Sequence, residues 1–233
     1  MKPQIYPAFL FTVLLLALAS VVAPVTSYAQ SITVISKRKI YRQQVLQDSN
    51  NTMVELRSVL PHVVYDLRYA TPHNFTGHVL YKEGNNTFLR LPAARALARV
   101  MDDLAKQDLH LKVFDAYRPY SVTRKMWALI KDERYVANPA KGSGHNRGIA
   151  VDLTILDHSG KELDMGTAYD NFTDSAHHTF TSLSPAATKN RTLLKTTMER
   201  HGFKALETEW WHYSVPGSAT YDVLDIPFKK LRK

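Results

Sequence analysis

Two short segments of this chain carry the side-chain types that bind a transition metal. The first places His145 seven residues before Asp152, and the second contains His212. Asp152 lies in an apolar run, where a carboxylate without a partner would protonate or destabilise the fold, and a metal ion is one partner that prevents this. Because the offset between His145 and Asp152 is odd, they cannot share a face of one regular strand. We therefore expect the glycine-flanked loop to turn His145 back toward Asp152; a plain hydrogen bond between the two is the alternative.

A second carboxylate stands three residues before His212, in the segment Glu209-Trp210-Trp211-His212. Three protein ligands leave one coordination position open for water, whose pKa then falls to about 7. A carboxylate beside that water can take its proton and return it to the leaving amine, which is the role we predict for Glu209. The alternative is that the two tryptophans belong to the core and that His212 is a hydrogen-bonded core histidine.

The absence of cysteine narrows the chemistry. It excludes a thiolate zinc cluster, a cysteine nucleophile and a lipid-modified N-terminal cysteine. A metal here would be bound by imidazole and carboxylate, which favours a catalytic site over a structural one. We predict one zinc ion per chain, bound by His145, Asp152 and His212.

The chain is basic, with a formal net charge of +9. Such a balance usually indicates a nucleic-acid partner. Here the Lys and Arg residues are scattered, apart from two clusters at residues 37–39 and 229–233. Together with the export predicted below, this favours solubility or attraction to an anionic envelope, and we predict no nucleic-acid partner.

Residues 1–29 have the pattern of a secretory signal peptide, with Lys2 as a basic start, a short apolar run, and small residues at Ser27 and Ala29. A retained membrane anchor is the alternative. The apolar run is short for a span, which needs roughly 20 residues, and Pro24 interrupts it. We therefore expect an exported protein of the periplasm or cell envelope, with residues 30–233 as one domain and no stable membrane span after cleavage. The sequence makes no prediction about the oligomeric state.

In the remaining chain, segments with the alternating apolar pattern of a strand and segments with the apolar spacing of a helix follow one another in no regular order. Residues 30–51 look like a poorly packed leader. We predict strands at 63–69, 111–116, 149–155, around 203 and at 210–215, and helices at 91–104, at 121–130 with Ser121 as the cap, and from 184 to 201. This order predicts a single α+β domain with a mainly antiparallel sheet flanked by helices, and with the zinc site at the sheet.

Several ordered segments resemble one known family. They are Asp66-Leu67-Arg68-Tyr69-Ala70-Thr71, Asn74-Phe75-Thr76-Gly77, Asp115-Ala116-Tyr117-Arg118-Pro119, residues 145–152, residues 165–170 and Glu209-Trp210-Trp211-His212. From Tyr65 to about Tyr213 the chain is similar to the D-alanyl-D-alanine dipeptidases, the VanX-like zinc peptidases that act on peptidoglycan D-Ala termini.

The resemblance implies roles for particular residues. It puts the zinc ligands at His145, Asp152 and His212 and the catalytic glutamate at Glu209. It also makes Arg118 the clamp for the developing oxyanion, whereas a structural ion pair before Pro119 is the alternative for that arginine. The arginine motif more commonly has glycine where Ala116 stands, a change that we expect to be harmless.

The same resemblance implies substrate contacts at Tyr69, Ser143 and Asp170. A dipeptide is a zwitterion, so we expect Asp170 and the Tyr69 hydroxyl to bind its amine and Ser143 with backbone N–H groups to bind its carboxylate. For Asp170 a plain turn role is the alternative.

The implied activity is zinc-dependent hydrolysis of the dipeptide D-Ala-D-Ala to two D-Ala. Predicted export favours a role in cell-wall peptide turnover or salvage. Two alternatives stay open within enzymes, a D,D-carboxypeptidase and an L-Ala-D-Glu endopeptidase acting on longer muropeptides. A third alternative, from another class, is a non-catalytic zinc module that binds peptidoglycan or a protein.

Overall fold

The computed structural model describes residues 1, 4, 32–217 and 220–232. The chain divides into two units, Met1–Gln30 and Ser31–Lys233. The predicted signal peptide at 1–29 lies outside the described residues except for Met1 and Gln4. Within the described ranges, no helix has both the length and the apolar character that crossing a bilayer requires.

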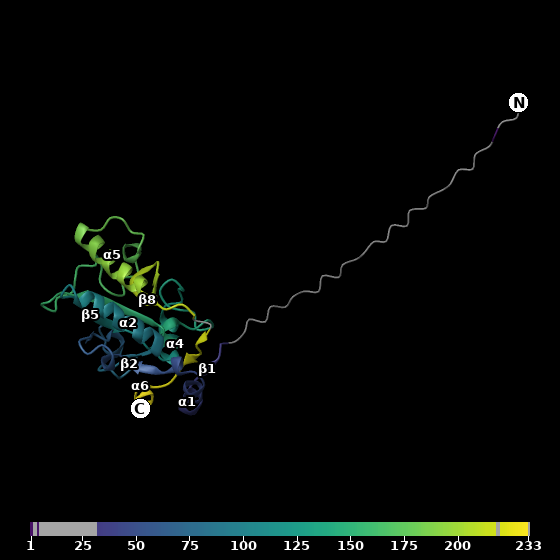
Figure 1. Ribbon diagram of the computed structural model, residues 1–233, viewed down its shortest axis with the longest axis horizontal. Coiled ribbons are helices and arrows are strands. Elements are labelled where there is room, and N and C mark those ends of the chain that lie inside the picture. Colours follow the sequence, from purple (N-terminus) through teal and green to yellow (C-terminus); the bar gives the residue numbers. More distant parts are fainter. Residues whose placement is uncertain (2–3, 5–31, 218–219, 233) are drawn as a thin grey trace. The chain divides into compact units, whose positions relative to one another are not determined.

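A five-stranded sheet forms the centre of the second unit (Figure 1). Its order is β3 (Val64–Tyr65), β5 (His110–Asp115), β6 (Ala150–Leu156), β8 (Glu209–Ser214) and β7 (Lys204–Leu206). β5, β6, β8 and β7 pair antiparallel, but β3 pairs parallel with β5. The sheet is therefore mixed, and the expectation of a mainly antiparallel sheet is corrected. The reason is the connection from β3 to β5, which includes a helix and so brings the chain back in the same direction.

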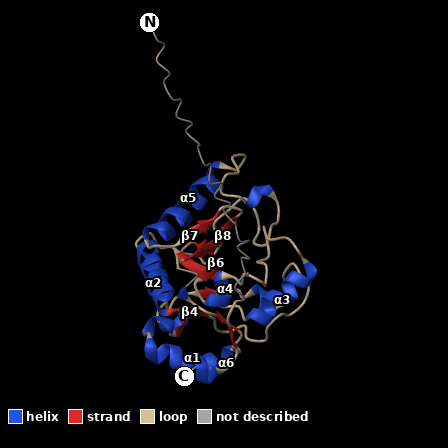
Figure 2. Cartoon of the chain, turned by 90° about the vertical axis from the view of Figure 1, so that its right-hand side faces the viewer, coloured by secondary structure: helices blue, strands red, loops and turns tan. Residues whose placement is uncertain are grey.

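Three helices cover the sheet, α2 (Leu91–Ala105), α3 (Tyr120–Leu129) and α5 (Pro185–Arg200). Figure 2 shows α2 and α5 on one side of the sheet and α3 on the other. The apolar spacing that predicts a helix at 91–104 forms a buried stripe of α2, at Ala94, Leu97, Val100, Met101 and Leu104.

The predicted start of one helix at Ser184 and the predicted cap of another at Ser121 have different outcomes. Ser184 caps α5, because its Oγ accepts a hydrogen bond from the backbone N–H of Ala187. Ser121 does not cap α3, which begins at Tyr120 with Pro119 as its N-cap. The Ser121 N–H and hydroxyl donate instead to Asp225 Oδ1, at 3.0 and 2.8 Å.

The predicted strand at 63–69 is shorter than expected. Its pairing with β5 ends at the hydrogen bond from Asp66 N to Val113 O. The chain continues as a 3-10 turn, η3 (Arg68–Ala70), so that Leu67 and Tyr69 still enter the interior. The predicted alternation of buried residues is therefore present, but part of it lies in a 3-10 turn and not in a strand. The remaining short elements are η1 (Ser49–Asn51), η2 (Leu56–Ser58), α4 (Gly144–Arg147) and η4 (Asp174–Ala176).

The expectation of a poorly packed leader at 30–51 is wrong. β1 (Val34–Ile35) pairs parallel with β9 (Val223–Leu224), and α1 (Arg38–Gln47) follows it. Tyr41 of α1 is buried, and its hydroxyl accepts a hydrogen bond of 2.8 Å from the N–H of Met53. A local pattern could not show this, because the strand that pairs with β1 comes from the far end of the chain.

A two-stranded ribbon and a last short helix complete the unit. β2 (Met53–Glu55) pairs antiparallel with β4 (Phe88–Arg90), and α6 (Phe228–Leu231) lies close to the end of the chain. Phe228 packs against Tyr81 at a ring-centroid distance of 5.0 Å, so the C-terminal segment belongs to the core.

Candidate active site

The three predicted metal ligands come from neighbouring pieces of backbone. His145 lies in the four-residue helix α4, which ends at Gly148 in a left-handed conformation with φ of +70°. A side chain at Gly148 would also collide with Met53, whose sulfur would lie 2.7 Å from the added Cβ. The turn leads into β6, where Asp152 stands directly opposite His212 of β8. The prediction that His145 is turned back toward Asp152 is thus confirmed, although a short helix rather than an open loop carries it.

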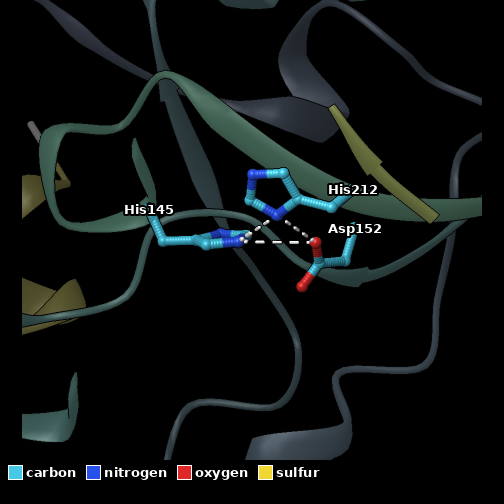
Figure 3. Close-up of side chains that lie close together, drawn as sticks. All are labelled: His145, Asp152 and His212. Carbon is cyan, nitrogen blue, oxygen red and sulfur yellow. Dashed lines mark hydrogen bonds and ion pairs between the residues drawn. The ribbon is translucent and has the colours of Figure 1, made fainter. Parts of the chain in front are cut away.

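The side chains of the three residues point toward one another, as Figure 3 shows. His212 Nδ1 lies 2.9 Å from Asp152 Oδ1, and His145 Nε2 lies 3.4 Å from the same oxygen. The two imidazole nitrogens are 3.2 Å apart. One ligand atom from each residue therefore falls within 4.8 Å of the others, as a single ion requires.

The hydrogen-bond chemistry of this cluster fits a cation. His145 Nδ1 lies 2.7 Å from the carbonyl oxygen of Ala116, which can only accept, so Nδ1 carries the hydrogen and Nε2 presents a lone pair. That lone pair, the carboxylate of Asp152 and Nδ1 of His212 converge on one point. A metal ion would accept an electron pair from all three at once, whereas without one a single N–H at His212 Nδ1 would have to be shared between His145 Nε2 and Asp152 Oδ1. Two imidazoles and a carboxylate are a zinc-type donor set.

Electrostatics support the same conclusion. Burial by itself would raise the pKa of Asp152, but the charges and hydrogen bonds of His145 and His212 outweigh it and hold that pKa below its ordinary value. Burial lowers the pKa of His212. An ionised carboxylate, together with an imidazole whose pKa is lowered, favours the deprotonated ligands that metal binding requires.

Glu209 lies at the start of β8 and is 7% exposed. Its Oε2 is 3.9 Å from His212 Nδ1, just outside the ligand cluster. Burial, followed by the charge of Asp152, raises the pKa of Glu209 well above its ordinary value. A carboxyl with that environment, placed beside a metal cluster but outside it, suits a group that takes up and releases a proton.

Arg118 follows β5 and is also buried. Its Nε donates to Asp115 Oδ2 at 2.7 Å, so the structural pair considered as an alternative exists. Its Nη2 lies 3.8 Å from Asp152 Oδ2, and the Nη nitrogens make no hydrogen bond to a protein atom in the described ranges. The ion pair thus orients the guanidinium and leaves its outer donors for the pocket. Burial opposes the charge of Arg118, but Asp115 overrides it and raises the pKa of the arginine.

Asp115 is a residue for which the sequence suggested no role. It is fully buried, and besides Arg118 it accepts a 2.9 Å hydrogen bond from the hydroxyl of Tyr81. Its position three residues before Arg118, in the same segment of resemblance to the family, was the available signal.

Tyr69 and Asp170 meet across the pocket from the sheet. The Tyr69 hydroxyl donates to Asp170 Oδ1 at 2.9 Å, although 101 residues separate them in sequence. Asp170 Oδ2 is buried and has no hydrogen-bond partner among the described residues. The backbone of Asp170 is in the left-handed region, with φ of +59°, which is uncommon for a residue other than glycine and costs free energy. Burial raises the pKa of Asp170 to about 7.

Ser143 caps α4, and its Oγ accepts a hydrogen bond of 3.1 Å from the N–H of Asn146. The hydroxyl hydrogen remains available as a donor. Asn146 in turn donates through Nδ2 to the carbonyl oxygen of Arg118, at 2.8 Å. The short helix therefore links Ser143, His145 and the arginine segment.

Tyr169 is the second residue that sequence reasoning missed. Its hydroxyl lies 3.0 Å from Asp152 Oδ2 and 3.0 Å from the hydroxyl of Tyr69. Its ring stacks on Phe114 with centroids 4.5 Å apart. Tyr169 therefore holds the second oxygen of Asp152 and joins the candidate ligand cluster to the pair Tyr69–Asp170. Its place directly before Asp170 in the family segment was the only signal.

One cavity of about 280 Å³ collects all eight predicted site residues. This volume is at the small end of the range for ligand pockets. Among the residues that line it are Tyr69, Arg118, Ser143, His145, Asp152, Asp170, Glu209 and His212.

Residues 49–230 match the protein family described as D-ala-D-ala dipeptidase. The chain is 36% identical over 172 residues to the D-alanyl-D-alanine dipeptidase of Escherichia coli (strain K12), a match that covers 74% of this chain and 89% of that relative. It is 32% identical to the D-alanyl-D-alanine dipeptidase of Enterococcus faecium, over 68% of this chain and 88% of the relative.

Among solved structures, the chain is similar to the LdcB LD-carboxypeptidase, with a TM-score of 0.38 and 22% identity over 60% of this chain and 66% of the other. It is also similar to VanYB in complex with D-alanine-D-alanine, with a TM-score of 0.37 and 16% identity over 60% of this chain and 76% of the other.

Proposed function

The chain belongs to the D-Ala-D-Ala dipeptidase family, and on that premise we propose that it is a zinc peptidase that hydrolyses the dipeptide D-Ala-D-Ala to two D-Ala. The observation that carries the proposal is one small cavity. It holds a cluster of two histidines and one aspartate on one side, and on the other a buried carboxylate oxygen without a hydrogen-bond partner among the described residues.

We propose that His145, Asp152 and His212 bind one zinc ion per chain. When bound, zinc would supply Lewis-acid activation of the attacking water and of the scissile carbonyl. Tyr169 supports this site, because its hydroxyl fixes the carboxylate of Asp152 through a 3.0 Å hydrogen bond.

Glu209 is proposed as the general acid/base. Its carboxylate takes a proton from the attacking water and gives it to the amine of the departing D-Ala, so the proton returns to solution with the product. The buried position of Glu209 excludes bulk water from this exchange.

Arg118 is proposed to stabilise the negative charge that develops on the carbonyl oxygen of the scissile peptide. Its two Nη nitrogens are the donors for this, while Nε stays bound to Asp115. Because the ion pair fixes the guanidinium beforehand, little reorganisation is needed when the charge appears.

The two ends of the dipeptide are assigned to opposite groups. We place the ammonium at Asp170, whose Oδ2 has no protein partner in the described part of the chain, with Tyr69 holding the other oxygen. We place the carboxylate at the Ser143 hydroxyl and the N–H groups of α4. An ammonium bound by a buried carboxylate leaves no room for further residues at that end, so the pocket favours a dipeptide over a longer peptide.

A comparison of two substrates tests this assignment. The purified protein with zinc should hydrolyse D-Ala-D-Ala with a higher kcat/KM than an N-acylated D-Ala-D-Ala, as measured by release of D-Ala. If the acylated peptide is the better substrate, the protein is a carboxypeptidase. If neither is cleaved while zinc is bound, the non-catalytic module is correct.

We further propose that the protein is exported to the periplasm or cell envelope, where it would act in cell-wall peptide turnover or salvage. The support is the basic, apolar and small-residue pattern of residues 1–29. Cell fractionation with mass analysis of the isolated chain tests this proposal, which requires a cut after Ala29 and recovery from the envelope fraction. An intact chain in the cytoplasmic fraction would refute it.

A further inference from the structure

Two basic segments from opposite ends of the second unit come together on one face of the protein. α1 and α6 lie side by side in both views (Figures 1 and 2), and Arg38 Nη2 donates to the carbonyl oxygen of Arg232 at 2.8 Å. The pairing of β1 with β9 holds the two segments in place. We call this face the α1/α6 patch, and its cations are Lys37, Arg38, Lys39, Arg42, Lys229, Lys230 and Arg232.

The patch contains most of the net charge of the chain. Without its seven cations, the 30 Lys and Arg of the sequence would fall to 23, against 21 Asp and Glu. The patch is therefore a concentration of positive charge, with Asp48 directly after α1 and Asp222, which accepts a hydrogen bond from Gln44 of α1, as neighbouring acidic residues. Neither segment, at 37–47 or 227–232, contains an acidic residue.

The charges of the patch are not neutralised by the protein. None of the seven forms an ion pair with a carboxylate in the described ranges, and all except Arg38 are exposed. Elsewhere on the surface some cations have partners, such as Lys106, which lies 2.7 Å from Asp103, and Lys195, which pairs with Glu199 on α5. Others, such as Arg124 and Lys189, form no ion pair in the described ranges. What distinguishes the patch is that seven such cations come together from two segments that contain no acidic residue.

Apolar side chains lie among these cations. Leu46 is 86% exposed and Ile40 is 40% exposed, both on α1. Leu46 lines a cleft of about 300 Å³ between α1 and α6 together with Arg42 and Lys230. A partner that is only a soluble polyanion gives no reason for an exposed leucine among arginines. A bilayer surface gives one, because headgroups attract the cations while the leucine enters the boundary of the acyl chains.

We propose that the α1/α6 patch binds the surface of an anionic phospholipid bilayer, with the cations at the headgroups and Leu46 at the acyl boundary. The association is peripheral and reversible, and it is independent of the metal cluster, whose residues lie on α4, β6 and β8. Since attraction of this kind is screened, it weakens as salt is added.

Vesicle sedimentation with the full chain tests the proposal. The two probes are vesicles of phosphatidylcholine alone and vesicles of equal parts phosphatidylcholine and phosphatidylglycerol. The measured quantity is the ratio of partition coefficients between the two, because any contribution of the apolar run at residues 8–23 is common to both. We expect at least about a tenfold preference for the anionic vesicles at low salt, and its loss at high salt.

Two four-fold variants separate position from net charge. The patch variant carries K39Q, R42Q, K229Q and K230Q. The matched control carries R124Q, K125Q, K189Q and K204Q, which removes the same charge from exposed positions on α3, α5 and β7. The patch variant should lose most of the anionic preference, and the control should keep it; equal behaviour of the two overturns the proposal. Unchanged D-Ala-D-Ala hydrolysis and melting temperature would show that both variants are folded.

A single substitution tests the choice of a bilayer over a soluble polyanion. L46S should weaken binding to the anionic vesicles a few-fold and leave binding to duplex DNA, a soluble polyanion, unchanged. If the protein binds the DNA as tightly as the anionic vesicles, or if L46S has no effect on vesicle binding, the bilayer is the wrong partner.

Discussion

The two sides of the active-site pocket are constructed in different ways. On one side, Asp152 and His212 are set by the register of β6 against β8, so backbone pairing fixes their positions. On the other side, Tyr69 and Asp170 lie on connecting segments and meet through one side-chain hydrogen bond. The sheet side concentrates the groups for the chemical step, and the connecting side concentrates the groups that would determine substrate length. Changes on the two sides should therefore have different kinetic signatures.

The largest effect is expected on the sheet side from loss of a ligand. H212A should abolish zinc binding and hydrolysis, and it should lower the melting temperature because the metal cross-links β6 and β8 to α4. Metal analysis by mass spectrometry, together with thermal unfolding, measures both effects. Chelation of the unmodified protein should give the same loss of activity, reversed by added zinc. A variant with a full complement of zinc would remove His212 from the ligand set.

E209Q should separate the proton transfer from the metal. It keeps the size of the side chain, so zinc content and melting temperature should match the unmodified protein, whereas kcat should fall by about 10²–10⁴. Steady-state kinetics on D-Ala-D-Ala measures the fall. Near-native turnover by the glutamine variant would mean that another group moves the proton.

D170N is expected to act through KM rather than kcat, with a rise of roughly tenfold for D-Ala-D-Ala, because it removes the negative charge facing the ammonium. Burial raises the pKa of Asp170 to about 7. The carboxyl is therefore neutral below that pH and ionised above it, so KM of the unmodified protein should fall as pH rises through about 7. The asparagine variant should lack this dependence and should discriminate less between free and N-acylated substrates. A pure effect on kcat would place Asp170 with the sheet side instead.

The smallest effect is expected from Y169F, which changes the tyrosine that links the two sides of the pocket. The phenylalanine ring keeps the stack on Phe114 and loses only the hydroxyl that holds Asp152. Zinc affinity should weaken by roughly tenfold, as is usual when a group supporting a metal ligand is removed, with little change in stability. A competition titration with a chromogenic chelator measures the affinity, and Y135F, a tyrosine of the pocket that stacks on Phe172, is the control. Equal affinities in the two variants would show that Tyr169 is only a packing residue.

The sequence predicted the sheet side better than the rest, for a physical reason. Asp152 stands in a strand that is buried at every position, and such a carboxylate has few explanations. The same argument applied to His212, and the family segments placed Glu209 and Arg118. The helices at 91–105 and 185–200 were also predictable, because their apolar spacing and the Ser184 cap are local features.

Long-range pairing accounts for what the sequence did not show. The parallel pairing of β3 with β5 and that of β1 with β9 depend on partners distant in the chain. The hydroxyl of Tyr169 is bound to Asp152, which is 17 residues away, and no local pattern indicates such a contact. The basic clusters were visible separately, but only the fold shows that they form one face.

Asp152 and His212 are 60 residues apart along the chain and meet only when β8 pairs with β6. A chain still being synthesised therefore has two of the three proposed ligands until β8 has emerged, and two ligands would hold an ion far less well than three. The set of three side chains is therefore complete only when β8 has paired with β6 in its final register. A copy truncated before β8 thus cannot become an active peptidase, however well its earlier segments have formed.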